Sequence, residues 1–293
     1  MKIHVGTAPD SWGIWFSEND RQIGWERCLD EMKAAGYEGV ELGPWGYFPN
    51  EGGRLKEELQ KRDLKLAAGT AGANYADDAS VDAMLKFLEE QQIPLLKQFD
   101  SVRYIDLLVE MYTDLITGKY VMKKELSDEE SGNMFRNINR TAAVIREHGY
   151  LPTLHPHVDC YIQTEEEIER VLENTDVELC LDTGHHVYGG GDPVTFYKKH
   201  HSRIPYLHVK ECDLSVKKQM ELENWSFAEA VTKDIMCEPG KGNIDFRKLF
   251  DIMKENGFDG WVVVEQDMYP VQDFSMPFQI ARRTREYLKM TGI

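Results

Sequence analysis

Two histidines stand two residues apart in the segment TLHPHVDC, residues 153–160. The segment has the pattern of a strand that ends in a loop, and side chains two apart on a strand point to the same face. His155 and His157 could therefore bind one ligand together, or they could be ordinary hydrogen-bonded groups at a strand end. One such pair does not decide between the two, so the polar residues on other strands carry the argument.

Three later segments place a polar side chain beside leucine or valine near the end of a predicted strand: Asp182, His208 and Glu265. The spacing from His155 to Asp182 is 27 residues and from Asp182 to His208 is 26, which is one strand–helix unit each. Two imidazoles and two carboxylates thus fall at equivalent depth on successive strands. Such a mixed nitrogen and oxygen set suits Mn²⁺, Co²⁺, Fe²⁺ or Zn²⁺. The four residues together predict a metal site.

The elements that must position these residues are eight β-rich runs, each followed by a helical pattern. This alternation over 293 residues predicts a single (β/α)8 TIM barrel spanning 1–293, with a helical excursion over the barrel mouth at about 212–243. A doubly wound open sheet is the alternative, but GTAPDSWG after the first run is not a glycine-rich phosphate loop. The runs are 2–7, 39–43, 64–70, 104–110, 151–157, 177–185, 204–211 and 260–267.

Several helix ends are also predicted from local residue types. Gly36, Gly149 and Gly257 follow helical patterns, as C-terminal caps do. Thr164 with Glu167 has the spacing of a capping box at a helix start.

The composition excludes several classes of partner. The net charge of −17 repels nucleic-acid backbones and anionic membranes, and leaves a small neutral substrate, or one held by a bound cation, as the compatible ligand. No apolar run reaches the roughly 18 residues of a membrane span. Five cysteines without CxxC spacing, and an N-terminus without a signal-peptide pattern, predict a cytoplasmic protein without disulfides.

Three more residues near the predicted site have both a structural and a functional interpretation. Lys210 lies two residues after His208 on the same face, where it is either a solvated lysine or a cation that moves a proton or steadies an oxyanion. His185 could orient a metal ligand or touch substrate. Trp12 could belong to the core or stack on a sugar ring.

The chain resembles the xylose-isomerase-like barrel superfamily, and within it the inosose dehydratase branch. The segments that carry the resemblance are HPHVDCYIQTEEEIERVLENTD, LDTGHHVYGGGDP, LHVKECDLSV and GWVVVEQD. It implies a divalent metal, manganese or cobalt first and zinc or iron as alternatives, held by His155, Asp182, His208 and Glu265. It also implies a lyase that removes water from a cyclic keto-polyol such as 2-keto-myo-inositol through a metal-stabilised enediolate.

Under that hypothesis the acid and base come from His157, Lys210 and Glu41, unassigned between them, and Trp12 and His185 contact the substrate. A keto-sugar isomerase or epimerase is the main alternative, and a metal-bearing sugar-binding protein without turnover is the second. The partner is a small polyol or sugar, and a homo-oligomer is possible. The sequence departs from the dehydratase pattern at Pro156, at Asp159–Cys160 and at Glu211, so these positions put the substrate in question.

Overall fold

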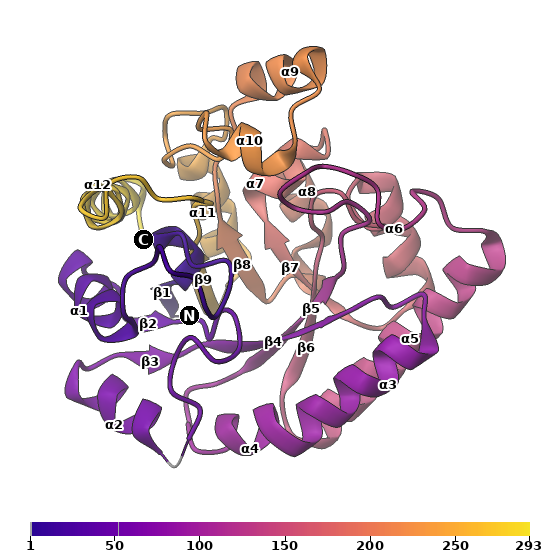
Figure 1. Cartoon of the computed structure of the whole chain (residues 1–293), viewed down its shortest axis with the longest axis horizontal. Helices are drawn as coiled ribbons and strands as arrows, with labels where there is room; N and C mark the ends of the chain where they lie inside the picture. The colour runs from indigo at the N-terminus through magenta and orange to yellow at the C-terminus, as the bar shows by residue number, and fades with distance from the viewer. Residues whose placement is uncertain (1, 52) are drawn as a thin grey trace.

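Parallel strands form a nearly closed barrel surrounded by helices (Figure 1). The computed structural model describes residues 2–51 and 53–293. Within those residues the strands follow one another around the barrel in the order β3-β2-β1-β9-β8-β7-β6-β5-β4. Their bounds are β1 (Ile3–Thr7), β2 (Gly39–Val40), β3 (Lys65–Leu66), β4 (Ala68–Ala73), β5 (Tyr104–Val109), β6 (Leu151–His155), β7 (Glu178–Asp182), β8 (Tyr206–Val209) and β9 (Gly260–Val264).

The predicted barrel is confirmed, and the open sheet is wrong. The third predicted run divides at Ala67 into β3 and β4, which pair with β2 and β5 respectively. Ala67 joins the two halves, because its N–H donates to the Val40 carbonyl at 2.9 Å and its carbonyl accepts from Arg103 at 3.3 Å. The two ends of the strand order are therefore consecutive in the chain.

Helices cover the outside of the barrel, as a parallel sheet buried on both faces requires. In α11, residues Phe246, Leu249, Phe250 and Met253 are buried at helical spacing, and every residue of β9 is buried. The helices are α1 (Trp25–Ala35), α2 (Arg54–Lys61), α3 (Asp78–Phe87), α4 (Ile93–Leu96), α5 (Asp128–Glu147), α6 (Glu165–Asn174), α7 (Thr183–Tyr188), α8 (Pro193–His200), α9 (Leu214–Glu223), α10 (Phe227–Val231), α11 (Phe246–Glu255) and α12 (Met276–Thr291), with the short turns η1 (Pro9–Trp12), η2 (Leu88–Gln92) and η3 (His201–Arg203).

The predicted helix ends are confirmed. Gly36 caps α1 with a left-handed φ of 96°, and Gly149 and Gly257 have φ of 87° and 72° just after their helices. Thr164 and Glu167 form the capping box of α6. These local signals are reliable because each satisfies backbone groups that the helix itself leaves unpaired.

The segment between β8 and α11 contains α9 and α10, which project beyond the strand ends at the top of Figure 1 in orange. The return of this segment is held by Glu211, whose buried carboxylate accepts the N–H groups of Gly240, Asn243 and Ile244 at 3.1–3.3 Å. No helix in the described part of the chain is long and apolar enough to cross a membrane.

Two glycine substitutions test the barrel packing with opposite expected signs. A Cβ on Gly39 in β2 would lie 2.4 Å from the Trp261 ring and 2.7 Å from the Lys65 carbonyl. We expect Gly39→Ala to lower the free energy of unfolding by about 1–3 kcal/mol through overpacking.

The matched control is Gly132→Ala on the exposed surface of α5, where a Cβ meets nothing within 4 Å. This change should raise the free energy of unfolding by up to about 1 kcal/mol, because alanine is the better helix former. Chemical denaturation measures both variants. An unchanged midpoint for Gly39→Ala would contradict the close strand packing.

Candidate metal centre and its cavity

A cavity of about 320 Å³ opens where the carboxyl ends of the strands meet. In a (β/α)8 barrel this end carries the functional residues. One part of the wall is apolar and includes Ile14, Trp15, Met111, Leu115 and Phe227. The other part is polar, and its charged or titratable members are Asp10, Glu41, Asp106, His155, His157, His208, Lys210, Glu265 and Asp267.

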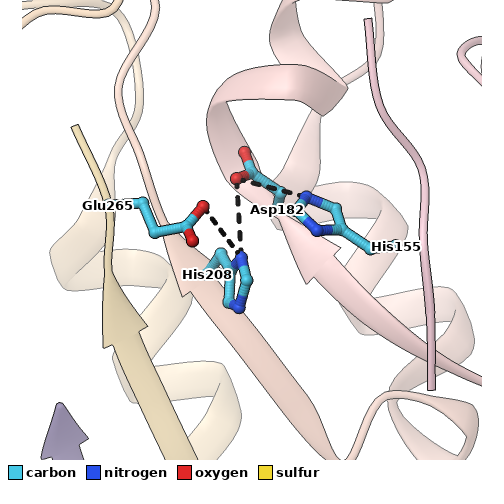
Figure 2. A group of neighbouring side chains, drawn as sticks. All are labelled: His155, Asp182, His208 and Glu265. Carbon is cyan, nitrogen blue, oxygen red and sulfur yellow. Dashed lines mark ion pairs between the residues drawn. The ribbon is translucent and has the colours of Figure 1, made fainter. Parts of the chain in front are cut away.

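Four of the predicted residues converge at this cavity (Figure 2). One ligand atom from each of His155, Asp182, His208 and Glu265 lies within 4.8 Å of the other three. The Asp182 Oδ2 atom is 3.6 Å from His155 Nε2 and 3.9 Å from His208 Nδ1, and His208 Nδ1 is 3.0 Å from Glu265 Oε2. We call these four residues the ligand cluster.

The ligand cluster fits a divalent ion. His155 Nε2, His208 Nδ1 and Asp182 Oδ2 are all buried and make no hydrogen bond. An ion with bonds of about 2.1 Å holds tetrahedral ligand atoms roughly 3.4 Å apart, which is close to the spacings observed here. Buried polar atoms without a hydrogen-bond partner are costly, so three such atoms close together make a group that could hold a cation.

His155 is held from behind by Asp106, which the sequence analysis did not single out. Asp106 Oδ2 lies 3.4 Å from His155 Nδ1, and Asp106 Oδ1 accepts the Thr153 hydroxyl at 2.7 Å. Burial opposes protonation of His155, but Asp106 and Asp182 outweigh it and raise the pKa of the imidazole to about 9. A carboxylate behind a histidine fixes the ring so that its other nitrogen faces a metal.

His208 has a corresponding support in Glu41. Glu41 Oε1 accepts the Tyr206 hydroxyl at 2.8 Å and lies 3.4 Å from His208 Nε2. Glu41 also belongs to the cavity wall. Glu41 therefore lies beside His208 Nε2, which makes no hydrogen bond, while His208 Nδ1 faces the ligand cluster.

Lys210 is fully buried among acidic groups, so it is not a solvated lysine. Its ammonium lies 3.3 Å from Asp182 Oδ2, 3.1 Å from Glu265 Oε2 and 3.2 Å from Asp267 Oδ2. Burial favours the neutral amine, but these three carboxylates prevail and hold the pKa of Lys210 well above its usual range. Lys210 therefore stays charged beside the carboxylate oxygen atoms of the ligand cluster.

His185 lies behind Lys210 and is buried. Its Nε2 is 3.0 Å from the Lys210 ammonium, and its backbone N–H donates to Asp182 Oδ1 at 2.8 Å. Burial and the Lys210 charge lower the pKa of His185 well below the ordinary value, so the neutral ring accepts from the lysine. Of the two roles open to His185, these contacts match the orienting one; it is not among the residues described in the cavity wall.

His157 is on the cavity wall with its ring centroid 4.0 Å from that of His185. Burial and the neighbouring His155 lower the pKa of His157 to about 3, so its ring is neutral near pH 7. Its Nδ1 lies 3.1 Å from the Val158 carbonyl, which can only accept a hydrogen bond. The ring hydrogen therefore belongs on Nδ1, and Nε2 keeps a free lone pair.

The structure does not bring Trp12 to the described cavity wall. The Trp12 side chain is 1% exposed, and its Nε1 donates to Glu31 on α1 at 2.8 Å. Trp12, the last residue of η1, is thus directed toward α1, whereas Trp15 lines the cavity. Trp15 stacks on Tyr269 with centroids 4.7 Å apart, which fixes its ring at the rim.

The departures from the dehydratase pattern act on loops around the cavity. Asp159 accepts the Thr113 hydroxyl at 2.8 Å, and its carbonyl accepts from Tyr112 at 2.7 Å. Asp159 thereby holds the loop after β5, which supplies Met111 to the wall. Glu211 faces the loop at 240–244 instead of the cavity.

Asp10 and Asp267 are acidic cavity residues that the sequence analysis missed. Burial is the main reason that the pKa of each is raised, and the Glu265 charge adds to it in both cases. The signal for Asp267 was present in the sequence, because it is two residues beyond Glu265 on the same strand path. Asp10 had no such signal, since it follows a strand in an irregular turn.

The fold and the site define a TIM-barrel protein with a cluster of potential metal ligands at the carboxyl ends of its strands. Residues 29–290 match the model of the family described as xylose isomerase-like TIM barrel, and the chain belongs to that family.

Similar proteins of known activity indicate the reaction class of this chain. An inosose dehydratase from Geobacillus thermodenitrificans is 32% identical, with 99% of this chain and 97% of that protein covered. The chain is thus an enzyme of the lyase class, a hydro-lyase.

Solved structures share the fold at low identity. A D-psicose 3-epimerase from Clostridium cellulolyticum H10, solved with D-tagatose, superposes with a TM-score of 0.73 at 16% identity, covering 98% of this chain and 99% of that one. The IolI protein "with a binding zinc atom" gives a TM-score of 0.69 at 16% identity, covering 98% and 96%. Identities this low show the fold alone.

Removal of single carboxylates tests the ligand cluster. Asp182→Ala and Glu265→Ala should each lose most of the bound metal, because each removes a charged ligand, while the fold persists since this end of the barrel serves function more than stability. Elemental analysis of purified protein measures the metal, and circular dichroism checks the fold. Asp20→Ala, an exposed carboxylate outside the cavity, is the charge-matched control. Full metal occupancy in both cluster variants would remove these residues from the coordination sphere.

Proposed function

We propose that this protein is a divalent-metal-dependent dehydratase that removes water from a cyclic keto-polyol such as 2-keto-myo-inositol. The observation that supports it best is the ligand cluster with its three unpartnered atoms, on the same cavity as a neutral histidine and a buried lysine. The full-length likeness to inosose dehydratase supplies the substrate class. The acidic surface and the five buried, unpaired cysteines suit a cytoplasmic enzyme.

The metal in this proposal is held by His155, Asp182, His208 and Glu265, with manganese or cobalt as the first candidates and zinc or iron as alternatives. When bound, such an ion supplies Lewis-acid polarisation of the substrate carbonyl. The two supporting carboxylates, Asp106 and Glu41, keep the histidine rings in place and so preserve the coordination geometry.

His157 is the proposed base for the α-hydrogen. Its Nδ1 hydrogen is directed at the Val158 carbonyl, so its free Nε2 can take a proton at the cavity wall. The general base must hold a lone pair within reach of the substrate, and among the predicted candidates His157 meets this condition best. Glu41, in contrast, is engaged by Tyr206 and His208.

Lys210 is the proposed electrostatic partner. A permanently charged ammonium in a dry cavity stabilises negative charge that develops on a substrate oxygen more strongly than it would in water. Three carboxylates hold it in place, and His185 accepts one of its hydrogens. Four acceptors surround the three hydrogens of the ammonium, so Lys210 acts on the substrate through its charge.

The apolar wall matches the ring of a cyclic substrate. Trp15 and Phe227 lie nearly parallel, with an interplanar angle of 13° and centroids 6.3 Å apart, and both line the cavity. Aromatic faces pack against the C–H face of a sugar-like ring and exclude water. The volume of about 320 Å³ accommodates one six-membered polyol.

The reaction class is tested by product mass. Metal-loaded enzyme incubated with a panel of inososes and linear keto-sugars should yield a product lighter by one water from at least one cyclic ketone, and prior chelation should abolish the reaction. An isomerase or epimerase would leave the mass unchanged in ordinary water and incorporate deuterium from heavy water. Mass-neutral products from every ketone tested would reject the dehydratase assignment.

Lys210→Met tests the electrostatic role while keeping side-chain length. We expect kcat to fall by about 100-fold or more, because an oxyanion-stabilising group is lost. Metal content should be at least that of the wild type, since the ammonium no longer shares Asp182 and Glu265 with the ion. An unchanged kcat at full metal loading would show that Lys210 does not act on the reaction.

A further inference from the structure

Asp10 is a cavity residue that the proposed chemistry does not yet use. It lies in the turn η1, directly after β1, and its side chain lines the cavity. Both of its carboxyl oxygens are buried, and neither has a hydrogen-bond partner. An acid group in this condition loses its hydration without compensation from the protein, so a ligand that fills the cavity is the natural partner.

The backbone holds Asp10 in this position. The Ser11 hydroxyl donates to the Val264 carbonyl at 3.3 Å and accepts from the Gln266 N–H at 3.0 Å. Thr7 donates to the same Val264 carbonyl at 2.9 Å. The residues before and after Asp10 are therefore fastened to the end of β9, and the carboxyl is presented by a fixed turn.

The charges around Asp10 decide which hydrogen bonds it can form. Burial raises the pKa of Asp10 most, Glu265 and Asp267 raise it further, and Lys210 and His208 lower it, with the balance well above the ordinary value. A protonated carboxyl offers one donor and free acceptors, whereas a carboxylate offers acceptors alone. In either state an oxygen atom remains free for a hydroxyl group.

We propose that Asp10 is a specificity-determining residue that binds a ring hydroxyl of the substrate at the cavity wall. The proposal rests on the proposed function for the identity of the ligand as a cyclic polyol.

Steady-state kinetics with three variants test the proposal. Asp10→Ala should raise KM about tenfold or more with a smaller change in kcat, because a hydrogen bond to a bound hydroxyl is lost. Asp10→Asn keeps a donor and an acceptor and should stay within about threefold of the wild type. Asp20→Ala, exposed and outside the cavity, removes the same formal charge and should not change KM.

Two further measurements distinguish loss of substrate recognition from misfolding and from loss of turnover. One pairs the Asp10 variant with substrates that lack single hydroxyls, and the other measures binding directly. Monodeoxy inososes, each lacking one hydroxyl, should include one that raises the KM of the wild type as much as Asp10→Ala raises the KM for the full substrate. With that compound, Asp10→Ala should raise KM no further, because the hydroxyl and its partner belong to one contact. Calorimetric titration of the metal-loaded enzyme with myo-inositol, which lacks the ketone, should give weaker binding for Asp10→Ala than for Asp10→Asn.

The kinetic and binding results for the Asp10 variants can contradict the proposal in distinct ways. The proposal would be overturned if Asp10→Ala had the same KM and the same affinity for myo-inositol as the wild type. It would also be overturned if Asp10→Asn were as impaired as Asp10→Ala, because that result would indicate proton transfer instead. If no ketone is dehydrated but Asp10→Ala still loses myo-inositol, the proposed function fails and the polyol contact stands. Absence of both dehydration and myo-inositol binding in the wild type would overturn the two together.

Discussion

Burial of like charges at the mouth of the barrel is the constraint on which the rest of this structure depends. Asp182, Glu265 and Asp267 are all less than a tenth exposed, and Lys210 is the cation that faces all three. Buried carboxylates without sufficient positive charge are costly by several kcal/mol each. A divalent ion held by the ligand cluster, as proposed, would supply the missing positive charge.

Residues around the ligand cluster contact its two histidines from the side away from the cluster. Asp106 holds His155, and Glu41, itself held by Tyr206, holds His208. Each histidine therefore has a carboxylate 3.4 Å from one ring nitrogen and its other nitrogen directed at the ligand cluster. A carboxylate on the far side of a histidine favours the ring orientation that a metal ligand needs.

Carboxylates also hold the loops that complete the cavity, although these loops carry few of the proposed reacting groups. Glu211 collects the backbone of the segment after α10, and Asp159 ties the loop after β6 to the loop after β5. Both residues hold loops around the cavity and lie outside the ligand cluster.

The sequence by itself determined the barrel and the four members of the ligand cluster, because strand alternation and the length of one strand–helix unit fix the depth of a residue along its strand. Only the tertiary structure decided the rest of the wall. Asp10 meets Glu265 because β1 pairs with β9 across the closure of the barrel, more than 250 residues apart. Likewise, only the tertiary structure shows that Trp12 contacts Glu31 of α1 while Trp15 lines the cavity. Such contacts depend on closure and on irregular turns, neither of which has a period that a sequence can reveal.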